Sequence, residues 1–130
     1  MASSLPTVLL VDESVDTLEM YAVGLHLAGY QAVLATDAEG GLNELHHALP
    51  KAVVTELHLG AQRTAWDFLR DIRRVPEAHL VPVILLTGRW QSTLADAARE
   101  AGFAAALMKP CSPTKLNHVI DLLSKAAAVS

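Results

Sequence analysis

The chain has 130 residues, of which 52% are apolar and 18% are charged, and its formal net charge is -4. This length and composition predict one folded domain over residues 1–130 and exclude a disordered chain. The acidic balance and the lack of any Lys/Arg run argue against nucleic-acid binding by this chain alone. No stretch reaches the ~20 apolar residues of a membrane span and the N-terminus lacks signal-peptide features, so we expect a cytoplasmic protein without membrane contact.

Five short apolar segments recur along the chain and predict five strands. Most consist of aliphatic or β-branched residues without polar alternation, which is typical of strands covered on both faces of a sheet. The predicted strands are 7–11, 31–35, 52–57, 81–87 and 104–108.

The segments that follow these strands carry apolar residues at helical spacing. The apolar positions are Leu18, Tyr21, Ala22, Leu25 and Ala28 in the first helix, Leu42, Leu45 and Leu49 in the second, Phe68, Leu69 and Ile72 in the third, and Leu116, Val119, Ile120 and Leu123 in the last. Gly29 and Gly102 end the first and fourth helices as C-terminal caps, and Ser112 followed by Pro113 begins the last.

Strands that alternate with helices predict a parallel sheet, because a parallel connection needs a crossover. The crossovers are right-handed and place helices on both faces. The fold class is therefore α/β: a three-layer α/β/α, (βα)5 doubly wound five-stranded parallel sheet.

Charged and hydroxyl side chains follow the predicted strands at their carboxyl ends, where open parallel sheets bind ligands. The first strand ends in Asp12 and Glu13, the third in Glu56, the fourth in Thr87, and the fifth in Lys109. We expect these side chains to converge on one crevice. Three carboxylates at close range repel one another unless a cation compensates them, and Lys109 or a magnesium ion would supply that charge.

The ordered set of motifs resembles the receiver domains of bacterial two-component response regulators, the CheY-like (flavodoxin-like) fold, over about residues 6–124. The matching pieces are "LLVDES", "GYQAVLATDAEGGL", "PKAVVTEL", "PVILLTG" and "GFAAALMKP". In that family an aspartate after the third strand takes a phosphoryl group from a histidine kinase. The resemblance implies a protein partner: a histidine kinase, a phosphotransfer protein, an effector, or a second copy of the chain.

The same resemblance assigns roles to the residues at the strand ends. Asp12 and Glu13 match the acidic pair that holds magnesium, with Glu56 as a further possible metal ligand. Thr87 and Lys109 match the hydroxyl and the ammonium that contact the phosphoryl oxygens. Glu56 matches the phosphoacceptor itself.

Glu56 departs from the family, in which this residue is an aspartate. One additional methylene moves the carboxylate by ~1.5 Å, and an error of about 1 Å costs roughly a hundredfold in a positioned reaction. We therefore predict a receiver that is independent of phosphorylation, in which Glu56 pairs with Lys109 and either imitates the phosphorylated state or leaves the domain inert. The alternative is weak phosphorylation at Glu56 with Mg²⁺ bound.

Three further departures support an altered mechanism. Ala106 stands three residues before the lysine, where receivers carry an aromatic residue that accompanies the switch. Glu13 replaces the usual aspartate, so magnesium would bind at a shifted position or not at all. The segment after the third strand, 58–68, lacks the family's Pro-Gly and is about one residue longer than usual.

Simpler structural roles are open to these and several other residues. The acids and the lysine could form only a solvated polar rim. The histidines lack metal-ligand spacing, although His58 could cover the pocket. Cys111 and Trp66 are better explained by packing, whereas Trp90 is either a partner contact or cover for the core.

An enzyme on a similar α/β fold is the last alternative. Phosphatases that resemble the haloacid dehalogenases need a second aspartate two residues after the nucleophile, and here Ser14 stands two residues after Asp12. Phosphate-loop lysine and dinucleotide motifs are absent from the sequence. We therefore expect no enzymatic activity.

Overall fold

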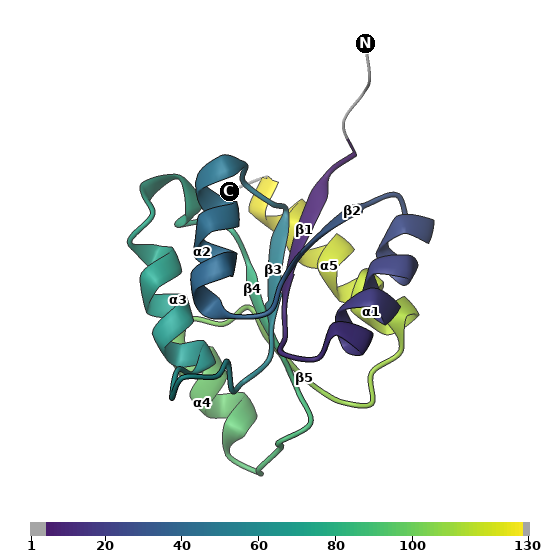
Figure 1. Ribbon diagram of the computed structural model, residues 1–130. Coiled ribbons are helices and arrows are strands. Elements are labelled where there is room, and N and C mark those ends of the chain that lie inside the picture. Colours follow the sequence, from purple (N-terminus) through teal and green to yellow (C-terminus); the bar gives the residue numbers. More distant parts are fainter. Residues whose placement is uncertain (1–4, 129–130) are drawn as a thin grey trace.

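Five strands and five α-helices alternate along the chain in the computed structural model, which describes residues 5–128 (Figure 1). The ends of the predicted domain, residues 1–4 and 129–130, lie outside the described residues. The strands are β1 (Thr7–Val11), β2 (Gln31–Ala35), β3 (Ala52–Thr55), β4 (Val83–Thr87) and β5 (Ala105–Met108). The helices are α1 (Val15–Leu27), α2 (Ala38–His47), α3 (Ala65–Arg73), α4 (Leu94–Ala101) and α5 (Pro113–Ala128), and a short 3-10 helix spans Pro76–Ala78.

All strands belong to one parallel sheet in the order β2-β1-β3-β4-β5. Helices α1 and α5 cover one face of this sheet, and α2, α3 and α4 cover the other (Figure 1). The predicted three-layer, doubly wound architecture is confirmed. Three parallel pairings place β1, β3, β4 and β5 side by side with their carboxyl ends at one edge, which positions the site.

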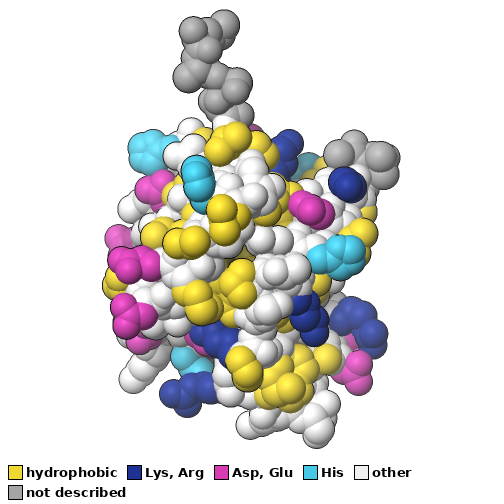
Figure 2. All heavy atoms as spheres, turned by 90° about the vertical axis from the view of Figure 1, so that its right-hand side faces the viewer, with side chains coloured by type: hydrophobic (Ala, Val, Ile, Leu, Met, Phe, Trp, Pro, Cys, Tyr) yellow, Lys and Arg dark blue, Asp and Glu magenta, His cyan; other side chains and the backbone are white. Residues whose placement is uncertain are grey.

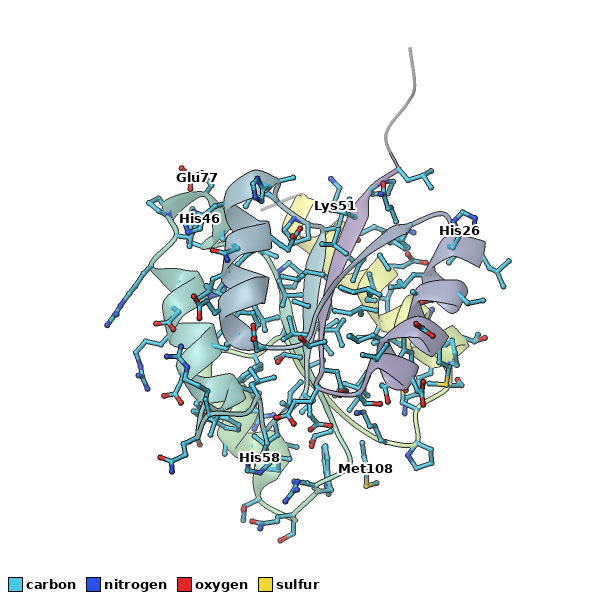
Figure 3. All side chains as sticks on the ribbon, viewed as in Figure 1. His26, His46, Lys51, His58, Glu77 and Met108 are labelled. Carbon is cyan, nitrogen blue, oxygen red and sulfur yellow. The ribbon has the colours of Figure 1, made fainter. Side chains whose placement is uncertain are left out.

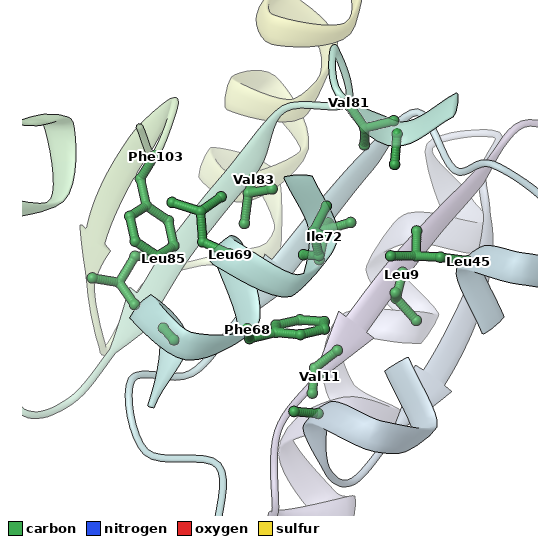
Figure 4. Packing of buried hydrophobic residues seen from close by; sticks show 14 of the residues in the cluster. Leu9, Val11, Leu45, Phe68, Leu69, Ile72, Val81, Val83, Leu85 and Phe103 are labelled. Carbon is green, nitrogen blue, oxygen red and sulfur yellow. The ribbon is translucent and has the colours of Figure 1, made fainter. Parts of the chain in front are cut away.

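Phe68 lies at the centre of the core between the sheet and α2 and α3. It is fully buried and packs among Leu9, Val11 and Ile72 (Figure 4). Gly41 on α2 makes room for it, since a Cβ atom at Gly41 would lie 2.9 Å from the Phe68 ring. Here a missing side chain on one helix shapes the packing of the next.

Helix α1 packs closely against α5 on the opposite face of the sheet. A Cβ atom at Gly24 would lie 2.6 Å from the Pro113 Cβ. The Asn117 amide on α5 donates a hydrogen bond of 3.0 Å to the Gly24 carbonyl. Only glycine permits the two helices to come this close. Because α1 and α5 are in direct contact, their outer sides form one continuous surface.

Several predicted boundaries differ from the structure. Strand β3 ends at Thr55, so Glu56 and Leu57 follow the strand rather than belonging to it, and β4 begins at Val83, after Pro82. Leu49 is exposed and lies beyond α2, because Pro50 disfavours helical geometry in the residue before it. Ala28 is the exposed C-cap of α1 and is not part of its buried stripe.

The predicted caps are confirmed in outline. Gly102 is the left-handed C-cap of α4, with φ 111°. Gly29, with φ 93°, follows the C-cap of α1. The Ser112 hydroxyl accepts a hydrogen bond of 3.1 Å from the Lys115 amide at the start of α5. Within residues 5–128, no helix combines the length and apolar content that a membrane span requires.

Candidate functional site

The side chains at the strand ends meet around the ammonium group of Lys109, which follows β5. Its Nζ donates a hydrogen bond of 2.7 Å to Asp12 Oδ2, after β1, and one of 2.8 Å to Glu56 Oε2, after β3. The three side chains are only 22%, 12% and 16% exposed, in the order Lys109, Asp12 and Glu56. A single cation thus links three strands of the sheet at its carboxyl edge.

The other carboxylate oxygens of this cluster are held by backbone amides. The Ser14 amide donates to Asp12 Oδ1 at 2.9 Å, and the Leu57 amide donates to Glu56 Oε1 at 2.7 Å. Each carboxylate therefore has one oxygen bonded to the lysine and one bonded to the main chain. This arrangement fixes the orientation of both carboxylates.

The environment favours the charged forms of Glu56 and Lys109. Burial disfavours the Glu56 carboxylate, but hydrogen bonds from Lys109 and Thr87 outweigh burial and lower the pKa of Glu56 below its ordinary value. Burial also disfavours the Lys109 ammonium, but hydrogen bonds to Asp12 and Glu56 outweigh it and raise the pKa of Lys109. The pair is therefore ionised at neutral pH.

Thr87 ends β4 beside this cluster and is fully buried. Its hydroxyl oxygen accepts a hydrogen bond of 3.0 Å from the Arg89 amide. Since the Thr87 hydroxyl also contributes to the lowered pKa of Glu56, it belongs to the same polar network. The four strand-end positions Asp12, Glu56, Thr87 and Lys109 therefore come together as the sequence predicts.

Glu13 does not join the carboxylates that hold Lys109. Its side chain is exposed, and its Oε1 lies 3.0 Å from the position that a Cβ atom of Gly60 would take. Gly60 belongs to the β3–α3 loop, where Gly60, Ala61 and Gln62 all have positive φ angles. The sequence predicted that three carboxylates would converge, but only Asp12 and Glu56 contact Lys109 among the described residues. Glu13 lies against the β3–α3 loop instead.

These residues do not fit a magnesium site as they are arranged. Mg²⁺ requires oxygen ligands in near-octahedral geometry at about 2.0–2.1 Å. The facing oxygens of Asp12 and Glu56 are bonded to an ammonium instead, and Glu13 lies against Gly60. Across residues 5–128, no three His, Cys, Asp or Glu side chains form a group that could hold a metal ion.

The remaining candidates lie around this edge of the sheet. Ala106 is half-buried on β5 and packs against the core beside Leu85. Trp90 is half-buried in the β4–α4 loop, so its role as a partner contact stays a prediction. His58 is exposed, and its backbone pairs with Thr64; Figure 3 shows it at the same end of the molecule as Met108.

Cys111 and Trp66 have the surroundings of packing residues. Cys111 is buried in the core beneath α1 and α5, and burial raises the pKa of its thiol, which opposes thiolate chemistry. The Trp66 ring lies 5.2 Å from the Phe103 ring, centroid to centroid.

Tyr21 is a contributor that sequence reasoning placed only in the apolar stripe of α1. Its hydroxyl donates a buried hydrogen bond of 2.6 Å to the Cys111 carbonyl, two residues after Lys109. The bond ties α1 to the segment that follows Lys109, which begins with a cis Lys109–Pro110 peptide. A tyrosine within an apolar stripe was the available signal, because a buried tyrosine hydroxyl usually has a partner.

Known proteins similar to this chain include response regulators. A family model described as Response regulator receiver domain matches residues 8–121. The "Uncharacterized 14.6 kDa protein in sodA1 3'region" of Leptolyngbya boryana is 26% identical over 88% of this chain and 86% of its own length. The phosphate regulon transcriptional regulatory protein PhoB of Escherichia coli (strain K12) is 26% identical over 84% of this chain, and the match spans 47% of that regulator.

Solved structures show the same fold. The chemotaxis response regulator CheY4 of Vibrio cholerae superposes with a TM-score of 0.83 and 22% identity, covering 92% of this chain and 99% of its own. A putative response regulator from Chloroflexus aurantiacus J-10-fl has a TM-score of 0.85 and 25% identity, covering 95% and 99%. The chain therefore belongs to the response regulator receiver domains, the signalling modules of two-component systems.

Proposed function

We propose that this chain is an atypical receiver that works without phosphorylation and acts by binding another protein, with Glu56 at the phosphoacceptor position. The observation that carries the proposal is the 2.8 Å hydrogen bond between Lys109 Nζ and Glu56 Oε2. In this proposal the lysine that would contact an incoming phosphoryl group is already bound to the acceptor side chain.

The hydrogen bonds around Glu56 make its carboxylate a weak nucleophile. Attack on phosphorus requires a free carboxylate oxygen aligned with the donor. Both oxygens of Glu56 accept hydrogen bonds, one from Lys109 and one from the Leu57 amide. The lowered pKa of Glu56 further reduces its basicity. We therefore expect phosphoryl transfer to Glu56 to be inefficient.

The charge of Glu56 suggests a permanent signalling state. The carboxylate places one negative charge beside Lys109 and Thr87, where a phosphoryl group would bring nearly two. Half of the charge, held by the same partners, imitates part of the phosphorylated state. Ala106 supports the same proposal, because no aromatic side chain is present at that position to report a change at Thr87.

The α1–α5 surface is the proposed partner surface. Met20, Val23 and Leu27 lie along the outer side of α1 and are 49%, 63% and 82% exposed. They border a groove that Pro113 and Asn117 line from α5. Figure 2 views the side of the molecule that carries α1 and α5, and hydrophobic side chains form several patches on it. An apolar surface of this kind fits a protein partner.

The chemical part of the proposal is tested by incubating the protein with a small-molecule phosphodonor and Mg²⁺, followed by intact-mass measurement. We expect the parent to remain unmodified and Glu56→Asp to gain one phosphoryl group. Glu100→Asp, a matched change at an exposed residue of α4, should behave as the parent does. A phosphoryl group mapped to Glu56 in the parent would refute the proposal.

The signalling part is tested by comparing association with a partner, or self-association, among the parent, Glu56→Asp and Glu56→Ala. If Glu56 imitates phosphate, Glu56→Ala loses the association and Glu56→Asp makes it depend on the phosphodonor. Identical association by all three proteins would show that Glu56 is not the switch.

A further inference from the structure

We infer that the Lys109 ammonium is the resident cation of the strand-end pocket, takes the place that a divalent metal ion would fill, and prevents Mg²⁺ and Mn²⁺ from binding there. The inference rests on the proposed function in one respect, which is that Glu56 remains paired with Lys109. The inference also predicts a gain of metal binding in a variant. Removal of the ammonium should create a divalent-cation site from the same two carboxylates.

The Lys109 ammonium lies between the two carboxylates of the pocket. Its nitrogen lies within 2.8 Å of one oxygen of Asp12 and one oxygen of Glu56, so it bridges carboxylates from two strands. A metal ion that used the same two oxygens would compete with Lys109 for the same space. Binding of the metal therefore requires displacement of the lysine.

The charges of the two carboxylates also require a cation in the pocket. Asp12 and Glu56 bring two negative charges into a pocket where both side chains are less than one-fifth exposed. Like charges at this range repel, and the cost grows with burial unless a cation lies between them. Lys109 supplies that cation from within the chain. Without it, the two carboxylates would form an uncompensated anionic pair, which is the chemistry that attracts Mg²⁺ or Mn²⁺.

Backbone amides bind the carboxylate oxygens that do not face Lys109. The Ser14 amide holds Asp12 Oδ1, and the Leu57 amide holds Glu56 Oε1. These bonds keep the opposing oxygens directed inward whether or not the lysine is present. The carboxylates are therefore oriented for a cation by the main chain, and Lys109 determines which cation occupies the space.

The test is a titration of the full chain with MgCl2 and, separately, MnCl2 at constant ionic strength. The proteins are the parent, Lys109→Gln, Lys109→Arg and Lys115→Gln, the last being a matched change at an exposed lysine of α5. The readouts are isothermal titration calorimetry and the paramagnetic broadening of backbone amide resonances by Mn²⁺.

We expect no saturable response from the parent, Lys109→Arg or Lys115→Gln. Lys109→Gln should bind one ion at least about tenfold more tightly than the parent, with broadening centred on residues 12 and 56. Saturable one-to-one binding by the parent, centred on those residues, would overturn the inference. A folded Lys109→Gln that binds no better than the parent would also overturn it. The parent titration needs no substitution and decides the matter if Lys109→Gln does not fold.

The outcome is separable from that of the proposed function. A parent that binds Mg²⁺ but gains no phosphoryl group would refute the inference about Lys109 and leave the proposed function standing. A parent that is phosphorylated at Glu56 would refute the proposed function, whatever the titration shows.

Discussion

Phe68 and Lys109 occupy two buried regions of the molecule that are stabilised in different ways. Phe68 is fully enclosed by apolar side chains, and its contribution grows with the apolar area it removes from water. Lys109 contributes only because two carboxylates accept hydrogen bonds from its ammonium group, and each of the three groups would be unfavourable alone. Phe68 is therefore stabilised by apolar contacts that carry no charge, whereas the pocket residues depend on one another for charge compensation.

The largest effect is expected from Phe68→Ala. Removal of a fully buried phenylalanine leaves a cavity and should lower the free energy of unfolding by about 3–5 kcal/mol. Urea denaturation measures this change, and Leu122→Ala, at a residue that is 55% exposed, provides the control. A loss below about 1 kcal/mol would mean that the core around Phe68 does not have the packing described.

Lys109→Met should be next in size. In metal-free buffer at neutral pH, the substitution leaves Asp12 and Glu56 facing each other without a cation. The free energy of unfolding should fall by about 2–3 kcal/mol, somewhat less than for a fully buried pair. Denaturation of Lys109→Met beside Lys115→Met measures the difference. Equal stability of the two variants would contradict the account of the pocket.

The pH dependence of Glu56→Gln distinguishes the pocket from the core. Since the pKa of Glu56 is lowered by folding, its carboxylate stabilises the protein above the ordinary glutamate pKa, and this stability is lost as the pH falls through the lower folded value. Glu56→Gln should therefore be less stable than the parent by about 1–2 kcal/mol at neutral pH, with the gap closing in acid. Denaturation series across pH test this, and Phe68→Ala should show a gap that stays constant.

The smallest effect is expected from Glu13→Gln. The side chain is exposed and makes no hydrogen bond to Lys109 among the described residues. The free energy of unfolding should change by less than about 0.5 kcal/mol. A change as large as that of Glu56→Gln would place Glu13 inside the coupled set after all.

The fold was predictable because its signals are local. Uninterrupted apolar strands, glycine caps and the handedness of crossovers each depend on a few neighbouring residues or on general chirality. The rule that ligand sites lie at the carboxyl ends of parallel strands then brought Asp12, Glu56, Thr87 and Lys109 together. Even the error at Leu49 had a local cause, since Pro50 follows it.

The direction of Glu13 and the role of Tyr21 could not be predicted in the same way. Glu13 follows Asp12 directly, and its orientation depends on the β3–α3 loop, which approaches through Gly60 from a distant part of the sequence. The Tyr21 hydroxyl bonds to Cys111, 90 residues away in the chain. A tyrosine in an apolar stripe indicates that its hydroxyl has a partner, but no local pattern identifies Cys111 as that partner or gives the direction of Glu13.

A double-mutant cycle between Glu56→Gln and Lys109→Met tests the central claim most directly, because it isolates the interaction between the two side chains. Free energies of unfolding of the parent, both single variants and the double variant would be measured in metal-free buffer at neutral pH. We expect a favourable coupling of about 1–2 kcal/mol between Glu56 and Lys109. Additive changes, with a coupling near zero, would contradict it.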